Sequence, residues 1–182
     1  MTDLGDVNWI LNMEVLFNGN SSLKGPQIID SDADQWAGNP INCKSISGYT
    51  AILSGATINW SLKKQSTVAL SSTEAEYITT ACATWEATWI QTFLSEIGYP
   101  LGKPILLYTD NQVTIKLIHN PVAHDQTKHI NVKYHFIHDA QAQGIIKVEY
   151  CLTKQQVADV LTKPLSHEKH KWFMEQMGLT SA

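Results

Sequence analysis

The sequence lacks the features that mark membrane-spanning and secreted proteins. It has no uninterrupted apolar run of the roughly 18 residues that a transmembrane helix needs. Its first residues, MTDLGDVNWI, carry acids where a secretory signal carries lysine or arginine. We therefore expect an intracellular protein, in the cytoplasm or the nucleus, that has no membrane partner.

Paired cysteines and an excess of positive charge are missing too. The 3 cysteines, Cys43, Cys82 and Cys151, are widely spaced and form no C-x-x-C pair. This spacing argues against structural zinc and favours buried free thiols. The net charge of −4 argues against a dedicated nucleic-acid binder that acts by itself. It is compatible with an enzyme that meets nucleic acid briefly.

What the sequence does have is a globular composition and a series of periodic segments. Apolar residues make up 43% of the 182 residues, enough for the core of one domain. Strands are predicted in QIID, on both sides of Ser54–Gly55, in ILLYT and in IIKVEY. Helices are predicted from Ser72 to about Ile97, in NQVTIKLIHN, in residues 131–143 and in two pieces near the C-terminus. This order predicts an α/β fold with a mixed sheet flanked by helices.

Four acids stand where this architecture can bring carboxylates together. Asp32 follows the first apolar run, Glu76 opens the long helix, Asp110 ends the ILLYT strand and Asp159 lies in VADVLTKPL. Such a set suits Mg²⁺, and two ions can hold the attacking water and the leaving oxygen of a phosphodiester. Each acid also has a structural interpretation: a turn residue for Asp32, a helix cap for Asp110, an exposed helical acid for Asp159.

Two glutamates of the predicted long helix face different directions. At about 100° per residue, Glu76 aligns with small and apolar side chains, whereas Glu74 lies nearer a polar arc of threonines. Both have capping-box spacing, from Ser71 or from Thr73. We interpret Glu74 as the cap and Glu76 as the ligand, because a carboxylate that faces the sheet needs a partner such as a metal.

The same helix carries a stripe of larger apolar residues. It comprises Ile78, Cys82, Trp85, Trp89 and Phe93, at spacings of three and four. We expect Trp85 and Trp89 to belong to the core rather than to serve as platforms on which bases stack.

Several motifs agree in order and spacing with those of a known family. They are SDAD, WAG, SGYT, INWSLKKQSTVALSSTEAEYI, LYTDNQ, TKHINVKYHFI and VADVLTKPL. Over roughly residues 28–180 the chain resembles the ribonuclease H domain of copia-type retrotransposon Pol polyproteins. The resemblance implies a ribonuclease H-like fold, with a five-stranded mixed sheet flanked by helices. It also implies an endonuclease that cleaves the RNA strand of RNA–DNA hybrids with two Mg²⁺ ions, or with Mn²⁺ in their place.

Carried over motif by motif, the resemblance assigns both the catalytic and the metal-binding role to Asp32, Glu76, Asp110 and Asp159. Asp34 is the alternative to Asp32, because Gln35 separates DAD from the tryptophan that follows it directly in the family. A bulge would absorb this extra residue, whereas a slip of register would turn side chains to the other face.

Contacts with the hybrid are expected from a second set of residues. These are Ser71, Ser72, Asn111, Lys128, His129 and His135. Lys63 and Lys64 are candidates for phosphate contacts. The structural alternative is a solvated surface for the lysines and packing for the histidines.

The N-terminal stretch MTDLGDVNWILNMEV resembles part of the reverse transcriptase that precedes this domain in the same polyprotein. The chain contains no adjacent pair of aspartates, so we expect no polymerase activity. We divide the chain into residues 1–27, a reverse-transcriptase remnant with its linker, and residues 28–182, the ribonuclease H domain. The implied partners are an RNA–DNA hybrid and the reverse-transcriptase domain of a parent element.

An active ribonuclease H is the leading prediction, and it has two rivals. A catalytically inactive relic, or a protein-binding module of the same fold, is favoured by the Gln35 insertion, the shortened upstream segment and the acidic balance. A DNA-cutting nuclease of the same broad fold, such as an integrase core, agrees less well with SSTEAEY and ADVLTKPL.

Overall fold

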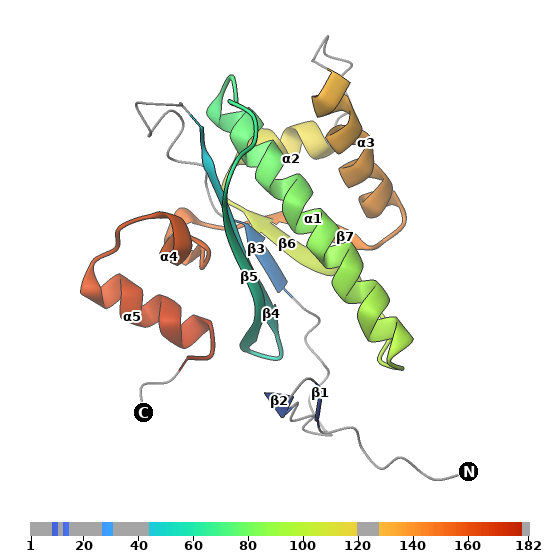
Figure 1. Ribbon diagram of the computed structural model, residues 1–182, viewed down its shortest axis with the longest axis vertical. Coiled ribbons are helices and arrows are strands. Elements are labelled where there is room, and N and C mark those ends of the chain that lie inside the picture. The colour runs from blue at the N-terminus through green and yellow to red at the C-terminus, as the bar shows by residue number, and fades with distance from the viewer. Residues whose placement is uncertain (1–8, 11–12, 15–26, 31–43, 120–127, 180–182) are drawn as a thin grey trace.

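The computed structural model describes residues 9–10, 13–14, 27–30, 44–119 and 128–179 (Figure 1). The elements are β1 (Trp9–Ile10), β2 (Met13–Glu14), β3 (Gln27–Asp30), β4 (Ile46–Leu53), β5 (Ala56–Lys64), α1 (Ser72–Glu96), β6 (Ile105–Thr109), α2 (Gln112–His119), α3 (Lys128–Ala142), β7 (Ile146–Tyr150), the 3-10 helix η1 (Thr153–Gln155), α4 (Asp159–Thr162) and α5 (His167–Gln176). From β3 onward they follow the predicted order of strands and helices. No helix in these ranges has the length and apolar character needed to cross a membrane.

Five strands form a mixed sheet in the order β5-β4-β3-β6-β7. β3, β6 and β7 are parallel, with Ile28 opposite Leu107 and Leu107 opposite Val148. β4 runs antiparallel to β3 and to β5. The three parallel strands therefore finish at the same end of the sheet, where β4 starts and β5 finishes. We call this the carboxyl end of the sheet.

The predicted hairpin between β4 and β5 is confirmed. Its turn consists of Ser54 and Gly55, with Leu53 opposite Ala56. Both turn residues have positive φ, 52° and 86°, the sign that a type I′ turn requires. The register shifts between Ala51 and the next residue, which marks a bulge. The hairpin is therefore set by local signals in the sequence.

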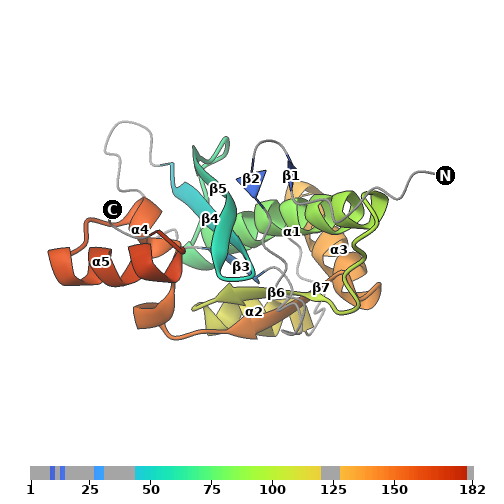
Figure 2. The ribbon, with the colours of Figure 1, turned by 90° about the horizontal axis from the view of Figure 1, so that it is seen from below.

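Apolar side chains cover the sheet on both faces. The larger cluster packs Ala51 and Leu107 against α1, α2 and α3. The smaller cluster joins Ile52 and Tyr108 to Phe173 of α5. Because neighbouring residues of a strand point to opposite faces, the two clusters lie on opposite faces of the sheet. Figure 1 and Figure 2 both place α4 and α5 across β4 and β5 from the group α1–α3.

The end of α5 is held against the turn of the hairpin. The backbone N–H of Thr57 donates to the carbonyl oxygen of Met177 over 3.0 Å. Gly178 has φ of +74°, and a Cβ there would lie 2.6 Å from the carbonyl oxygen of Gly55. A side chain at this position would therefore separate α5 from the hairpin.

The helix α1 buries a different stripe from the one expected. Trp85 and Trp89 are 68% and 58% exposed, so the expectation that they belong to the core is wrong. Trp85 stacks on Phe136 of α3 with ring centroids 4.9 Å apart, and Trp89 stacks on Phe93 at 5.3 Å. The buried stripe includes the column of Glu76, Ala83, Ala87, Ile90 and Leu94.

The cysteines also depart from expectation. Cys82 is exposed on α1, so the prediction of a buried thiol is wrong for this residue. Cys151, just beyond β7, is half-buried. Cys43 lies outside the described residues.

Candidate active site

Three of the four predicted acids lie on elements that meet at the carboxyl end of the sheet. β6 finishes one residue before Asp110. β7 finishes beside it, and the chain continues to Asp159, the first residue of α4. α1 begins at this end too, because Thr79 in its second turn contacts Ser47 at the start of β4. Glu76 lies in the same turn of α1. The carboxyl end of a parallel sheet is where sites of α/β proteins commonly form.

Glu76 is completely buried, on the face of α1 that packs on the sheet. The predicted cap is confirmed for the other glutamate. Ser71 Oγ accepts the backbone N–H of Glu74 at 3.1 Å, and Glu74 Oε2 accepts the N–H of Leu70 at 2.7 Å. These bonds satisfy donors at the helix start, which lie outside the helix's own ladder. That Glu76 binds a metal stays a prediction.

The tyrosine beside Glu76 adds no charge to it. Tyr77 is buried and stacks on Tyr134, with ring centroids 6.1 Å apart. Burial, and to a smaller extent Tyr134, raises the pKa of Tyr77 well above its ordinary value. Its hydroxyl therefore stays protonated at physiological pH, and Glu76 meets no second anion there.

A buried amide fixes the start of α1 on the hairpin. Gln65 follows β5 and is 6% exposed. Its Nε2 donates to Ser47 Oγ at 2.8 Å and to the carbonyl oxygen of Ala75 at 2.9 Å. Ser47 Oγ lies 2.7 Å from Thr79 Oγ1, which donates to the same carbonyl oxygen at 3.0 Å. This ring of hydrogen bonds holds the turn Ala75–Thr79 of α1, which contains Glu76.

Asp110 does not cap the helix that follows it. That position belongs to Asn111, whose Oδ1 accepts the backbone N–H groups of Val113 and Thr114 at 3.0 Å each. The backbone N–H of Asn111 in turn donates to Thr109 Oγ1 at 3.3 Å. The structural interpretation of Asp110 as a cap is therefore wrong, and its carboxylate is half-exposed at the end of β6.

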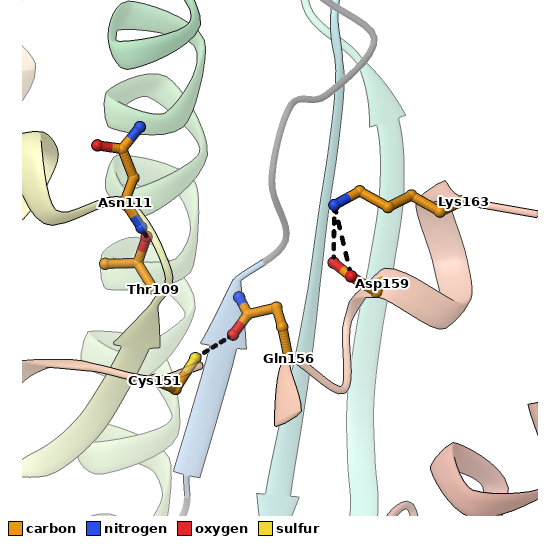
Figure 3. A network of polar contacts seen from close by, with 6 residues as sticks. All are labelled: Thr109, Asn111, Cys151, Gln156, Asp159 and Lys163. Atoms are coloured by element: carbon orange, nitrogen blue, oxygen red, sulfur yellow. Dashed lines mark hydrogen bonds and ion pairs between the residues drawn. The ribbon is translucent and has the colours of Figure 1, made fainter. Parts of the chain in front are cut away.

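Asp159 is paired with a lysine one turn later in the chain. Lys163 Nζ lies 3.3 Å from Oδ1 and 3.4 Å from Oδ2 of Asp159 (Figure 3). The two side chains are only 7% and 17% exposed, for the aspartate and the lysine respectively. The interpretation of Asp159 as an exposed helical acid is therefore wrong. A bound cation would compete with Lys163 for this carboxylate.

The segment between β7 and α4 is anchored to the neighbouring strand. The backbone N–H of Cys151 donates to the carbonyl oxygen of Thr109 over 3.1 Å. Its thiol donates to Oε1 of Gln156, a fully buried residue (Figure 3). These contacts fix the path by which the chain reaches Asp159.

Several predicted residues cannot be placed on this site. Asp32 and its alternative Asp34 lie outside the described residues, as do the side chains of Lys128 and His129. Ser72 and His135 are exposed, and their contact with substrate stays a prediction. Asn111 and Ser71 are occupied as helix caps, through the oxygen atoms described above.

The carboxylates fit a hard divalent cation in their chemistry, since Glu76, Asp110 and Asp159 offer only oxygen donors. Among the described residues no group of three or more His, Cys, Asp or Glu side chains is close enough to hold a metal ion. A cation at this end of the sheet would therefore require these side chains to approach one another, with Asp32 or Asp34 joining them.

The predicted site set omits Lys163 and Gln65. Lys163 has a signal in the sequence, because it stands four residues after Asp159, the spacing of an ion pair on a helix. Gln65 has none, because its acceptors come from β4 and α1, which only the fold brings together.

Comparison with known proteins identifies relatives of this chain. It is 43% identical over 150 residues to the retrovirus-related Pol polyprotein from transposon RE1 of Arabidopsis thaliana. It is 40% identical over 151 residues to the corresponding polyprotein from transposon TNT 1-94 of Nicotiana tabacum. The chain is homologous to part of the Pol polyproteins of copia-type transposons. The resemblance expected from the motifs is thereby confirmed.

The alignments cover most of this chain but only a small part of each polyprotein. The alignments cover 82% and 83% of this Pol-related chain, but only 10% and 11% of the polyproteins. No protein-family model matches the chain. Among solved structures, LC11-RNase H1 in complex with an RNA/DNA hybrid aligns with a TM-score of 0.49 and 10% identity. That alignment covers 72% of this chain and 86% of the other.

Proposed function

We propose that this chain is a ribonuclease H that cleaves the RNA strand of RNA–DNA hybrids with the help of Mg²⁺. The observation that carries the proposal is a fully buried glutamate, Glu76, at the same end of the sheet as Asp110 and Asp159. A buried carboxylate at the same end of the sheet as two further acids suits a shared hard cation, for which carboxylate oxygens are the ordinary ligands. The identity with Pol polyproteins of copia-type transposons supports the proposal.

In this proposal Asp32, Glu76, Asp110 and Asp159 hold two Mg²⁺ ions, for which Mn²⁺ can substitute. When bound, such ions activate a water and offset the charge that develops on the scissile phosphodiester. Asp32 belongs to the set because it stands two residues after β3, which is parallel to β6 and finishes at the same end of the sheet.

The remaining residues of the site would position and release substrate. Lys163 offsets the charge of Asp159 in the absence of metal, and Asp159 would have to exchange this lysine for a cation in order to hold one. Ser72, Lys128, His129 and His135 would contact the hybrid, and Ser71 and Asn111 would do so from the two helix caps. The partner that brings the hybrid would be the reverse-transcriptase domain of a parent element.

An inactive relic of the same fold is the second candidate. The observation that favours it is the ion pair of Asp159, both of whose oxygens lie within 3.4 Å of Lys163 Nζ. If the lysine keeps this carboxylate from the cation, the site lacks one of its ligands. The domain would then bind nucleic acid or protein without cleaving it.

Cleavage of a labelled hybrid separates the two candidates. We expect the wild-type protein to cut the RNA strand in Mg²⁺ or Mn²⁺. Asp110→Asn should lower the rate by at least about a hundredfold, because a ligand worth several kcal/mol is lost. Asp139→Asn, an exposed aspartate of α3, is the matched control and should cleave like the wild type. Binding of the hybrid without any cleavage by the wild type, in either metal, would establish the relic.

A further inference from the structure

The outer face of β5 displays apolar and cationic side chains that the fold leaves uncovered. Trp60 is 61% exposed and Leu62 is 53% exposed, and Lys64 continues the same row. Trp60 stands opposite Thr50. Thr50 is two residues from Ile52 in β4, so the two side chains point to the same face, the one that carries α4 and α5. Trp60 therefore lies on that face. We call Trp60, Leu62 and Lys64 the β5 strip.

The hairpin that carries the strip is the cationic part of an acidic chain. No aspartate or glutamate occurs between Asp34 and Glu74, although the chain has 17 acids and a net charge of −4. The same interval contains Lys44, Lys63 and Lys64. The chain has no arginine. Lysine is therefore the side chain that carries a permanent positive charge for phosphate contacts.

The strip leads toward the candidate active site. β5 finishes at the carboxyl end of the sheet, and Gln65, the residue after Lys64, donates to the carbonyl oxygen of Ala75, the residue before Glu76. α4 packs on β4, the strand next to β5, and carries Asp159 on the same face as the strip. Figure 3 shows the Asp159–Lys163 pair in front of these two strands.

We propose that the β5 strip binds a single strand of nucleic acid that continues from the hybrid in the active site. The proposal rests on the proposed function and adds a substrate class to it: a hybrid with a single-stranded extension. The ring of Trp60 would stack on an unpaired base, which any base permits. Lys64, at the end of the same row, would neutralise an adjacent phosphate.

The charge of the hairpin decides between nucleic acid and a protein occupant. A protein surface that only matched Trp60 and Leu62 would gain nothing from an interval free of acids. A polyanion would be repelled by any acid placed there, so their absence over this interval favours phosphate as the partner. The nearby carboxylate of Glu86 approaches from the α1 face, where it accepts bonds from Tyr49 and Asn59.

The test compares two probes by fluorescence anisotropy, without divalent metal so that the hybrids stay intact. One probe is a blunt RNA–DNA hybrid, and the other is the same hybrid with a single-stranded DNA extension at one or the other end. The wild type should bind the extended probe more tightly. Trp60→Ala should remove that gain, about 5- to 100-fold for one stacked base. Replacing Lys64 by Gln should reduce the salt dependence on the extended probe by about 0.7 in slope.

Two control variants are matched to these changes. Trp89→Ala removes a tryptophan of similar exposure from α1, and Lys103→Gln removes an exposed lysine before β6. Both should bind the two probes like the wild type.

Three outcomes would overturn the proposal. The strip variants could retain the full preference for the extended probe, or they could lose affinity equally for both probes. Alternatively, the wild type could self-associate in sedimentation while Trp60→Ala stays monomeric, which would assign the strip to a second copy of the chain. Failure of cleavage alone would reject the proposed nuclease but leave the strip's preference for extended probes intact, so the two failures are distinguishable.

Discussion

Replacing Gln65 by Met should destabilise the protein by about 2 kcal/mol, because two hydrogen bonds are lost. The bonds from Nε2 to Ser47 Oγ and to the carbonyl oxygen of Ala75, at 2.8 and 2.9 Å, have ordinary lengths. The third contact, to Thr79 Oγ1 at 3.5 Å, is too long to count. Ser47 and Ala75 remain bonded through Thr79, so no acceptor is stranded and the loss stays near the sum of two bonds.

Urea denaturation measures this loss as a shift of midpoint at constant m-value. Gln143→Met, the same change at an exposed amide, should stay within about 0.5 kcal/mol of the wild type. A double-mutant cycle with Ser47→Ala should return a coupling energy of at least about 0.5 kcal/mol, since the two side chains are in contact. A Gln65→Met protein as stable as the wild type, or a cycle without coupling, would refute the ring of bonds.

Four other substitutions test the helix start, the site and a half-buried histidine. Ser71→Ala should lower the free energy of unfolding by about 1 kcal/mol in urea, because the cap of α1 is lost. Glu76→Gln should abolish metal-dependent cleavage of the hybrid, while Glu74→Gln should retain it; the reverse result would exchange their roles. Burial lowers the pKa of His138 below its ordinary 6.5, so the unfolded chain takes up a proton first and stability falls as pH drops below 6.5. His138→Gln should flatten this part of the urea-measured pH profile, and an unchanged slope would contradict the assignment.

The sequence was sufficient wherever a local signal determines the structure. Ser54–Gly55 predicted a tight turn, and Gly98, the stop of α1, has φ of +88° as such positions require. The 100° spacing of residues along the helix predicted that Glu76 lies on the buried face, and it does. The same spacing separated Glu74 from Glu76, and Glu74 is the residue that caps the helix start. Each of these depends on residues within one turn or one helix, so the chain alone specifies them.

The sequence was insufficient where burial depends on how a side chain satisfies its own polar atom. Thr84, on the threonine arc of α1, is fully buried, whereas Trp85 next to it, which we expected in the core, is exposed. Thr84 Oγ1 donates to the carbonyl oxygen of Thr80 at 2.8 Å, and Thr80 Oγ1 donates to that of Glu76 at 2.9 Å. A threonine that bonds one turn back can enter the core at little cost, so hydrophobicity alone selects the wrong stripe.

The candidate site depends on two separate cores. Glu76 and Asp110 are placed by α1 and β6, which pack in the larger cluster. Asp159 begins a helix of only 4 residues, too short to be stable by itself, and its neighbours Val157 and Ala158 are buried in the smaller cluster. The position of this acid is therefore set by α5 and by its contact with the hairpin turn. Loosening the smaller cluster would displace one acid and leave the other two in place, so the site can lose its function without the larger core losing its fold.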